Sequence, residues 1–141
     1  MKKIITLLFS IVLLTACSET TYNDYKFSGE SEHWEAEYSF QGTEKSGGKD
    51  GSSNEDSYEF RLKYKGTLEE LSSLKKIEYS YETNFSGEDI TKEFTEPPST
   101  VTFSSSGHSI GGAEVEEDEV IKVNVKWDDF EESFELHNKS K

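Results

Sequence analysis

Alternating apolar and polar positions dominate the chain beyond about residue 24. Period-two alternation in aromatic and β-branched residues is typical of half-buried strands with one wet face. The clear runs are 34–40, 58–64, 77–81, 121–127 and 133–137, with shorter candidates at 25–27 and 101–103. The pattern therefore predicts about seven short strands in antiparallel sheets.

Charges on the outward faces predict two of the strand pairings. Glu35 and Glu37 on 34–40 would face the basic residues of 58–64, which are Arg61 and Lys63. Opposite charges suit cross-strand neighbours, so we expect these two strands to pair. In the same way Lys122 and Lys126 match Glu135. We expect 121–127 and 133–137 to form a hairpin that turns at 128–132.

One segment departs from alternation. Thr67 and Glu70 fit a capping box, and Leu68, Leu71 and Leu74 follow at spacings of three. We predict a short helix over 68–75 that crosses one end of the sheet. The fold class that follows is all-β: an antiparallel β-sandwich of immunoglobulin-like type with one short helix. A small closed or half-open β-barrel is the alternative.

Two stretches have the composition of loops. Residues 41–57 contain several glycines, and residues 104–112 are rich in Ser and Gly. A connection as long as 41–57 is unusual for a hairpin unless it is mobile or functional. We expect both stretches to be loops.

The N-terminus indicates where the protein is held. Two lysines at 2 and 3 precede an apolar stretch over 4–14, which suits the apolar region of a signal peptide and is too short to span a membrane. The next residues, Leu14, Thr15, Ala16 and Cys17, resemble the lipobox of bacterial lipoproteins. This resemblance implies a diacylglyceryl group on the Cys17 sulfur and cleavage between Ala16 and Cys17. An ordinary secretory signal with a free Cys17 thiol, or a buried structural Cys17, are the alternatives.

The lipobox divides the chain into a signal peptide (1–16), a lipidated tether (17–24) and a single β domain (25–141). Over most of its length the chain also resembles small lipoproteins of Bacillus-type Gram-positive bacteria. That resemblance rests on the lipobox, the Gly29-Glu30-Ser31-Glu32-His33-Trp34 stretch, Tyr64-Lys65-Gly66 and the ending at 121–127 and 134–136. It implies a place on the extracytoplasmic face of the cytoplasmic membrane. It provides no activity that could be carried over to this chain.

Composition narrows the classes of partner. The chain has 15 Lys+Arg against 29 Asp+Glu, a formal net charge of −14. Loss of residues 1–16 would remove two lysines, leaving 13 − 29 = −16. Nucleic acid is a poor partner for so acidic a chain, because phosphate binding needs a basic surface. One Cys excludes a disulfide within the chain.

Candidate chemistry is sparse. The run at 114–119 holds five carboxylates in six residues; such density favours a cation or a basic partner, although a solvated turn is the more common outcome. Its weak candidate metal ligands are Glu116, Glu117, Asp118 and Glu119. A calcium-loop pattern begins at Asp50, Ser52, Asn54 and Asp56 and then fails at Glu55 and Arg61.

No catalytic constellation is recognised. His33, His108 and His137 have no paired-ligand spacing, and no nucleophile motif occurs. The sequence therefore predicts no catalytic residues, no enzyme and no cofactor. Four aromatic residues lie outside clean alternation and would mark a partner site if exposed together: Tyr22, Phe85, Phe94 and Phe130.

These observations favour a membrane-anchored binding or structural module of the cell envelope. Its partners would be the membrane through the lipid anchor and an extracytoplasmic protein or envelope polymer. A surface enzyme or enzyme inhibitor is one alternative, and a cation-binding envelope protein is the other.

Overall fold

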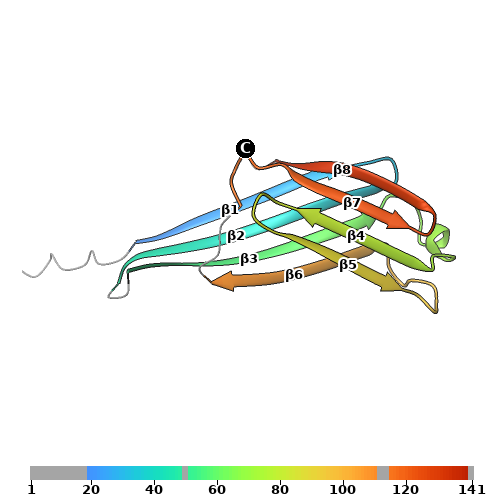
Figure 1. Ribbon diagram of the computed structural model, residues 1–141, viewed down its shortest axis with the longest axis horizontal. Coiled ribbons are helices and arrows are strands. Elements are labelled where there is room, and N and C mark those ends of the chain that lie inside the picture. Colours follow the sequence, from blue (N-terminus) through green and yellow to red (C-terminus); the bar gives the residue numbers. More distant parts are fainter. Residues whose placement is uncertain (1–18, 49–50, 111–114, 140–141) are drawn as a thin grey trace, which may run out of the picture.

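The computed structural model describes residues 19–48, 51–110 and 115–139, which form one antiparallel sheet. The spatial order of its eight strands is β5-β4-β7-β8-β1-β2-β3-β6 (Figure 1). The strands are β1 (Glu19–Glu30), β2 (Trp34–Gly48), β3 (Gly51–Tyr64), β4 (Lys76–Glu82), β5 (Gly87–Glu93), β6 (Thr102–Ile110), β7 (Ile121–Trp127) and β8 (Phe130–Asn138). The prediction of an all-β, antiparallel fold is confirmed.

The two halves of the curled sheet join over a short seam. β1 pairs with β2 along twelve positions, but with β8 only at Phe27↔Asn138 and Ser28↔His137. Gly29 follows at once, and a Cβ atom there would lie 2.0 Å from the carbonyl oxygen of Glu135. Only glycine lets the two strands approach so closely at this position.

Rings from the two halves meet inside the curl. Phe60 of β3 stacks on Tyr81 of β4 with ring centroids 4.6 Å apart. Trp34 of β2 meets Trp127 of β7 at 5.5 Å. The result is an open half-barrel with the layered core of a sandwich, which spans both predicted alternatives. Its immunoglobulin-like character stays a prediction.

Both predicted pairings are confirmed. Glu35 lies opposite Lys63, and Glu37 lies opposite Arg61. β7 pairs with β8 in a hairpin, but the turn is Asp128-Asp129 rather than 128–132, because Trp127 already pairs with Phe130. Asp128 adopts a positive φ of 51°, which a two-residue hairpin turn requires.

The two predicted loops are wrong as loops. Residues of 41–57 extend β2 and β3 into a long hairpin, and β6 covers 104–110. Two glycines in these stretches make room for rings rather than for turns. A Cβ atom on Gly107 would lie 2.6 Å from the Tyr58 hydroxyl, and one on Gly42 would lie 3.0 Å from the Phe40 ring. Residues 49–50 and 111–112 lie outside the described residues.

The predicted helix over 68–75 shortens to a single 3₁₀ turn, η2 (Glu69–Leu71). The capping contact is present: the Thr67 hydroxyl accepts the Glu70 N–H at 3.2 Å. Leu71 and Leu74 are buried, whereas Leu68 is exposed. The backbone hydrogen bonds join residues three apart, from the Leu71 N–H to the Leu68 carbonyl and from the Ser72 N–H to the Glu69 carbonyl, both at 3.0 Å, which is the spacing of a 3₁₀ turn and not of an α-helix.

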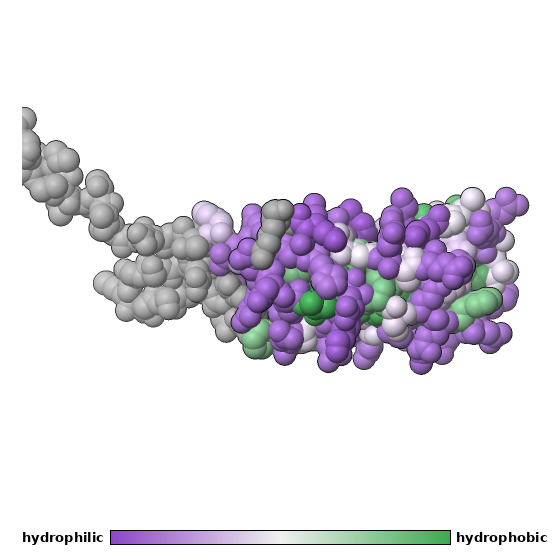
Figure 2. All heavy atoms as spheres, turned by 90° about the horizontal axis from the view of Figure 1, so that it is seen from above, coloured by the Kyte–Doolittle hydropathy of each residue, from purple (hydrophilic) through white to green (hydrophobic). Residues whose placement is uncertain are grey.

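The start of the first strand and the group of turns lie at opposite ends of the domain. β1 begins at Glu19, inside the stretch assigned to the tether; the division into signal, tether and domain stays a prediction. The β1–β2 turn, η2 and the β7–β8 turn gather at the opposite end, hereafter the distal end (Figure 1). Twelve residues of β1 place the two ends about 36 Å apart. The face in Figure 2 is mainly polar, with small apolar areas.

Candidate functional site

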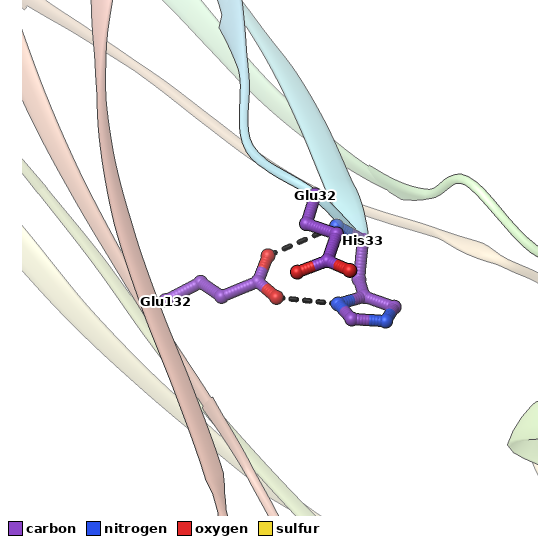
Figure 3. A group of neighbouring side chains, drawn as sticks. All are labelled: Glu32, His33 and Glu132. Carbon is purple, nitrogen blue, oxygen red and sulfur yellow. Dashed lines mark hydrogen bonds and ion pairs between the residues drawn. The ribbon is translucent and has the colours of Figure 1, made fainter.

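A compact polar cluster occupies the distal end. Ser31, Glu32 and His33 form the turn between β1 and β2, which closes when the Ser31 N–H donates to the Trp34 carbonyl at 2.7 Å. Glu132 reaches this turn from β8, near the start of that strand (Figure 3). The hairpin at Asp128-Asp129 places Glu132 here by setting the register of β8.

Glu132 holds the turn with both of its carboxylate oxygens. Oε1 accepts the Ser31 hydroxyl at 2.5 Å and the His33 N–H at 3.0 Å. Oε2 lies 2.5 Å from Nδ1 of the His33 ring. The Glu132 side chain is 17% exposed and that of His33 is 44% exposed. One carboxylate is therefore fixed and partly shielded, and the imidazole beside it remains open to solvent.

The electrostatics of this pair favour its charged form. The hydrogen bond to Glu132 raises the pKa of His33, with a smaller opposing effect of burial and further support from the charges of Glu132, Glu32 and Glu70. Burial raises the pKa of Glu132, but the hydrogen bonds from Ser31 and His33 together with the His33 charge outweigh it and leave that pKa below its usual value. The two groups stabilise each other as imidazolium and carboxylate.

Glu32 brings a second carboxylate to the same place. Its oxygen, a ring nitrogen of His33 and an oxygen of Glu132 all lie within 4.8 Å of one another. Figure 3 shows the Glu32 carboxylate turned toward the gap between the other two groups. Within the described part of the chain, this is the one group of three side chains that could hold a metal ion.

Aromatic rings line one side of the cluster. The Trp127 ring lies 5.8 Å from the His33 ring and packs below against Trp34. Phe130 stacks on Trp127 at 5.3 Å and is 62% exposed. The imidazole is thus held between a carboxylate and an indole, and the exposed Phe130 ring stacks on that indole.

The acidic run at 114–119 divides between interior and surface. Glu119 is buried and accepts the N–H groups of Asn84 at 2.9 Å and Glu116 at 3.3 Å, so its carboxylate closes two turns. The side chains of Glu116, Glu117 and Asp118 are exposed. Glu114 lies outside the described residues. The described members of the run form no group of three metal-ligating side chains.

The remaining candidates are scattered. Asp56 is buried in β3, where Ser52 and Asn54 also lie, and Asp50 is outside the described residues. His108 lies on β6 opposite Ser57, and His137 lies on β8 beside Glu135 at 3.7 Å.

The four unpatterned aromatic residues do not gather in one place. Phe94 packs against the core. Exposed Tyr22 lies near the start of β1, exposed Phe85 in the turn after β4, and exposed Phe130 at the distal end. They therefore form no single partner site.

Sequence reasoning missed the distal cluster as a unit. His33 and Glu132 are 99 residues apart, and each sits in an ordinary polar stretch. The β7–β8 hairpin was predictable, but the seam between β8 and β1 that brings Glu132 to the turn has no sequence signal.

Among the described residues, no helix has the length and apolar character needed to cross a membrane. Leu14, Thr15, Ala16 and Cys17 lie outside the described residues, and their roles stay predictions. No curated protein and no solved structure matches the chain. Residues 1–18 match the family model of the prokaryotic membrane lipoprotein lipid attachment site. This match supports a membrane-anchored lipoprotein, and the described residues form its all-β domain.

Proposed function

We propose that this lipoprotein stands on the extracytoplasmic face of the cytoplasmic membrane of a Gram-positive, Bacillus-type cell. Leu14, Thr15 and Ala16 would be recognised by the signal peptidase, and Cys17 would carry the diacylglyceryl group. The support is the match over 1–18 together with the charged start and the apolar stretch that precede the lipobox.

Its domain acts as a binding module of the envelope rather than as an enzyme, and the distal end is the binding surface. The observation that carries this proposal is the arrangement of the two ends. The chain enters the domain at the start of β1, and the cluster of Ser31, His33 and Glu132 with exposed Phe130 lies at the far end of the same strand. A site in that position reaches away from the bilayer toward an extracytoplasmic protein or an envelope polymer.

Site-specific photo-crosslinking in intact cells tests the proposal. A photoreactive phenylalanine analogue replaces Phe130 in one strain and Tyr22 in another. The two positions are matched, because both rings are largely exposed: Phe130 is 62% exposed and Tyr22 is 71% exposed. Phe130 lies at the distal end, and Tyr22 lies near the start of β1. We expect a discrete crosslinked species from position 130 and none of that size from position 22.

The outcomes separate the two ends. The same species from position 22 alone would move the binding surface to the membrane-proximal end and contradict the proposal. Absence of any species from both positions would contradict a binding role. The assigned face needs a separate check, because crosslinking also proceeds inside a cell: protease added to intact cells should remove the domain, and its survival would contradict the extracytoplasmic face.

A further inference from the structure

The three side chains of the distal cluster offer the donor set of a transition-metal ion. His33 supplies one imidazole nitrogen, and Glu32 and Glu132 supply one carboxylate oxygen each, all within 4.8 Å of one another. Imidazole selects zinc-like ions over Mg²⁺ and Ca²⁺, and Ca²⁺ takes six to eight oxygen ligands, far more than the two carboxylates here. Zn²⁺ accepts one nitrogen and two oxygens, with a fourth position left for water.

The three donor atoms lie within reach of a single tetrahedral ion. Zinc lies about 2.0–2.2 Å from such donors, which places the donors about 3.4 Å apart. His33 Nδ1 and Glu132 Oε2, now 2.5 Å apart, would open slightly as the ion takes the place of their hydrogen bond. Glu32 is exposed in a turn, so its carboxylate can close the remaining gap without moving a strand.

The surroundings orient the two inner ligands. The Ser31 hydroxyl and the His33 N–H hold Oε1 of Glu132, which leaves Oε2 turned toward the ring. Trp127 packs against the imidazole at 5.8 Å and limits its rotation. Outer groups that fix a ligand in this way typically change metal affinity by 10–100-fold. Glu70, whose charge acts on His33, adds a further negative group nearby.

We propose that Glu32, His33 and Glu132 form a zinc-binding site at the distal end of the domain, with an open fourth coordination position. The site does not depend on a protein partner, so it can be tested apart from the binding role proposed above. Its alternative is a structural ion pair between His33 and Glu132 that takes no metal.

Zinc titration of the full-length lipoprotein, purified in detergent without a histidine tag and treated with a chelator, decides between them. We expect one Zn²⁺ per chain to remain after gel filtration, measured by elemental analysis, and a single site in calorimetry. His33→Ala and Glu132→Gln should each weaken binding by more than about 100-fold, beyond the usual loss of an outer group. Glu32→Gln removes the exposed third ligand and should weaken binding by about tenfold or more.

His137→Ala is the matched control, because His137 also pairs with a glutamate, at 3.7 Å, but joins no group of three metal-ligating side chains among the described residues. It should bind zinc as the parent chain does. Glu32→Gln alters an exposed side chain and keeps the test valid if the Glu132 variant fails to fold. Equal zinc binding by the parent chain, His33→Ala and Glu32→Gln would overturn the proposal, as would retention of no zinc or selective uptake of Ca²⁺.

Discussion

Tyrosine supplies much of the interior, and each buried tyrosine brings a polar hydroxyl group into the core. Tyr38, Tyr79 and Tyr81 are almost fully buried. The Tyr81 hydroxyl donates to Glu88 at 2.7 Å. Burial raises the pKa of Tyr38, and burial followed by the hydrogen bond to Glu88 raises that of Tyr81. The folded state therefore strongly prefers neutral phenols at these positions.

This preference predicts destabilisation in alkali. A phenol whose pKa is raised by folding contributes stability that is complete below the unfolded pKa of about 10 and is lost above it, at up to about 1.4 kcal/mol per pH unit. We expect the free energy of unfolding to fall between pH 10 and 11, and to fall less steeply in Tyr38→Phe. Urea denaturation at each pH measures this. Tyr22→Phe, at an exposed position, should keep the parent slope; equal slopes in all three chains would contradict the prediction.

Single positions could be assigned to the interior, because alternation marks inward residues such as Trp34, Phe60 and Val123. Alternation says nothing about polar exceptions. Glu119 is buried because it satisfies two backbone N–H groups that come together only in the fold. Its neighbours in the same acidic run stay exposed, and composition alone cannot distinguish them.

At the scale of the element, one residue closes the β7–β8 hairpin and fastens it to β4. Asp128 Oδ1 accepts the N–H groups of Lys75 at 3.0 Å and Lys76 at 3.2 Å. The Asp128 N–H donates to the Lys76 carbonyl at 3.1 Å. Its positive φ is one that aspartate and asparagine tolerate better than most residues.

Asp128→Ala should therefore lower the free energy of unfolding by about 1–3 kcal/mol, because two N–H groups lose their acceptor and alanine disfavours this φ. Asp128→Asn keeps an acceptor and the φ tolerance, and should recover most of the loss. Chemical denaturation provides the measurement, with the exposed neighbour Asp129→Ala as control. Equal stability of Asp128→Ala and the parent chain would show that the turn does not depend on this side chain.

Strands with a clear alternation of apolar and polar residues were predictable from the sequence. Strands that lack this alternation and are held mainly by backbone hydrogen bonds were not. Complementary charges predicted the pairing of β2 with β3 correctly. The Ser- and Gly-rich strand β6 has almost no apolar pattern, yet it pairs with β3 along nine positions. The 3₁₀ turn was read as a helix because spacing of three fits both forms.

On the scale of the whole molecule, the acidic domain is tied to a membrane at one end. The formal charge of the chain is −14, and anionic headgroups repel such a surface within a Debye length. Repulsion and tether together would hold the domain away from the bilayer. The proposed lipid would then supply the strong attachment, because a net charge of this sign gives an anionic bilayer no overall attraction.

Replacement of the proposed lipidated residue follows from this. We expect Cys17→Ser to move the protein from the membrane fraction to the soluble fraction, because two acyl chains are needed for stable anchoring. Fractionation followed by a high-salt wash measures the distribution. Ser18→Ala, the adjacent substitution, should leave the protein in the membrane fraction. Salt-resistant membrane association of Cys17→Ser would contradict lipidation at this residue.

The twelve-position ladder between β1 and β2 also has a mechanical consequence. If a partner grips the distal end while the lipid holds the start of β1, tension runs along the strand axis. When the grip falls on the β1–β2 turn, the continuous backbone of β1 carries the load, and the β1–β2 hydrogen bonds, from Glu19↔Ser46 to Glu30↔Glu35, do not have to open. A tethered domain of this geometry is suited to bearing pull between the membrane and whatever it holds.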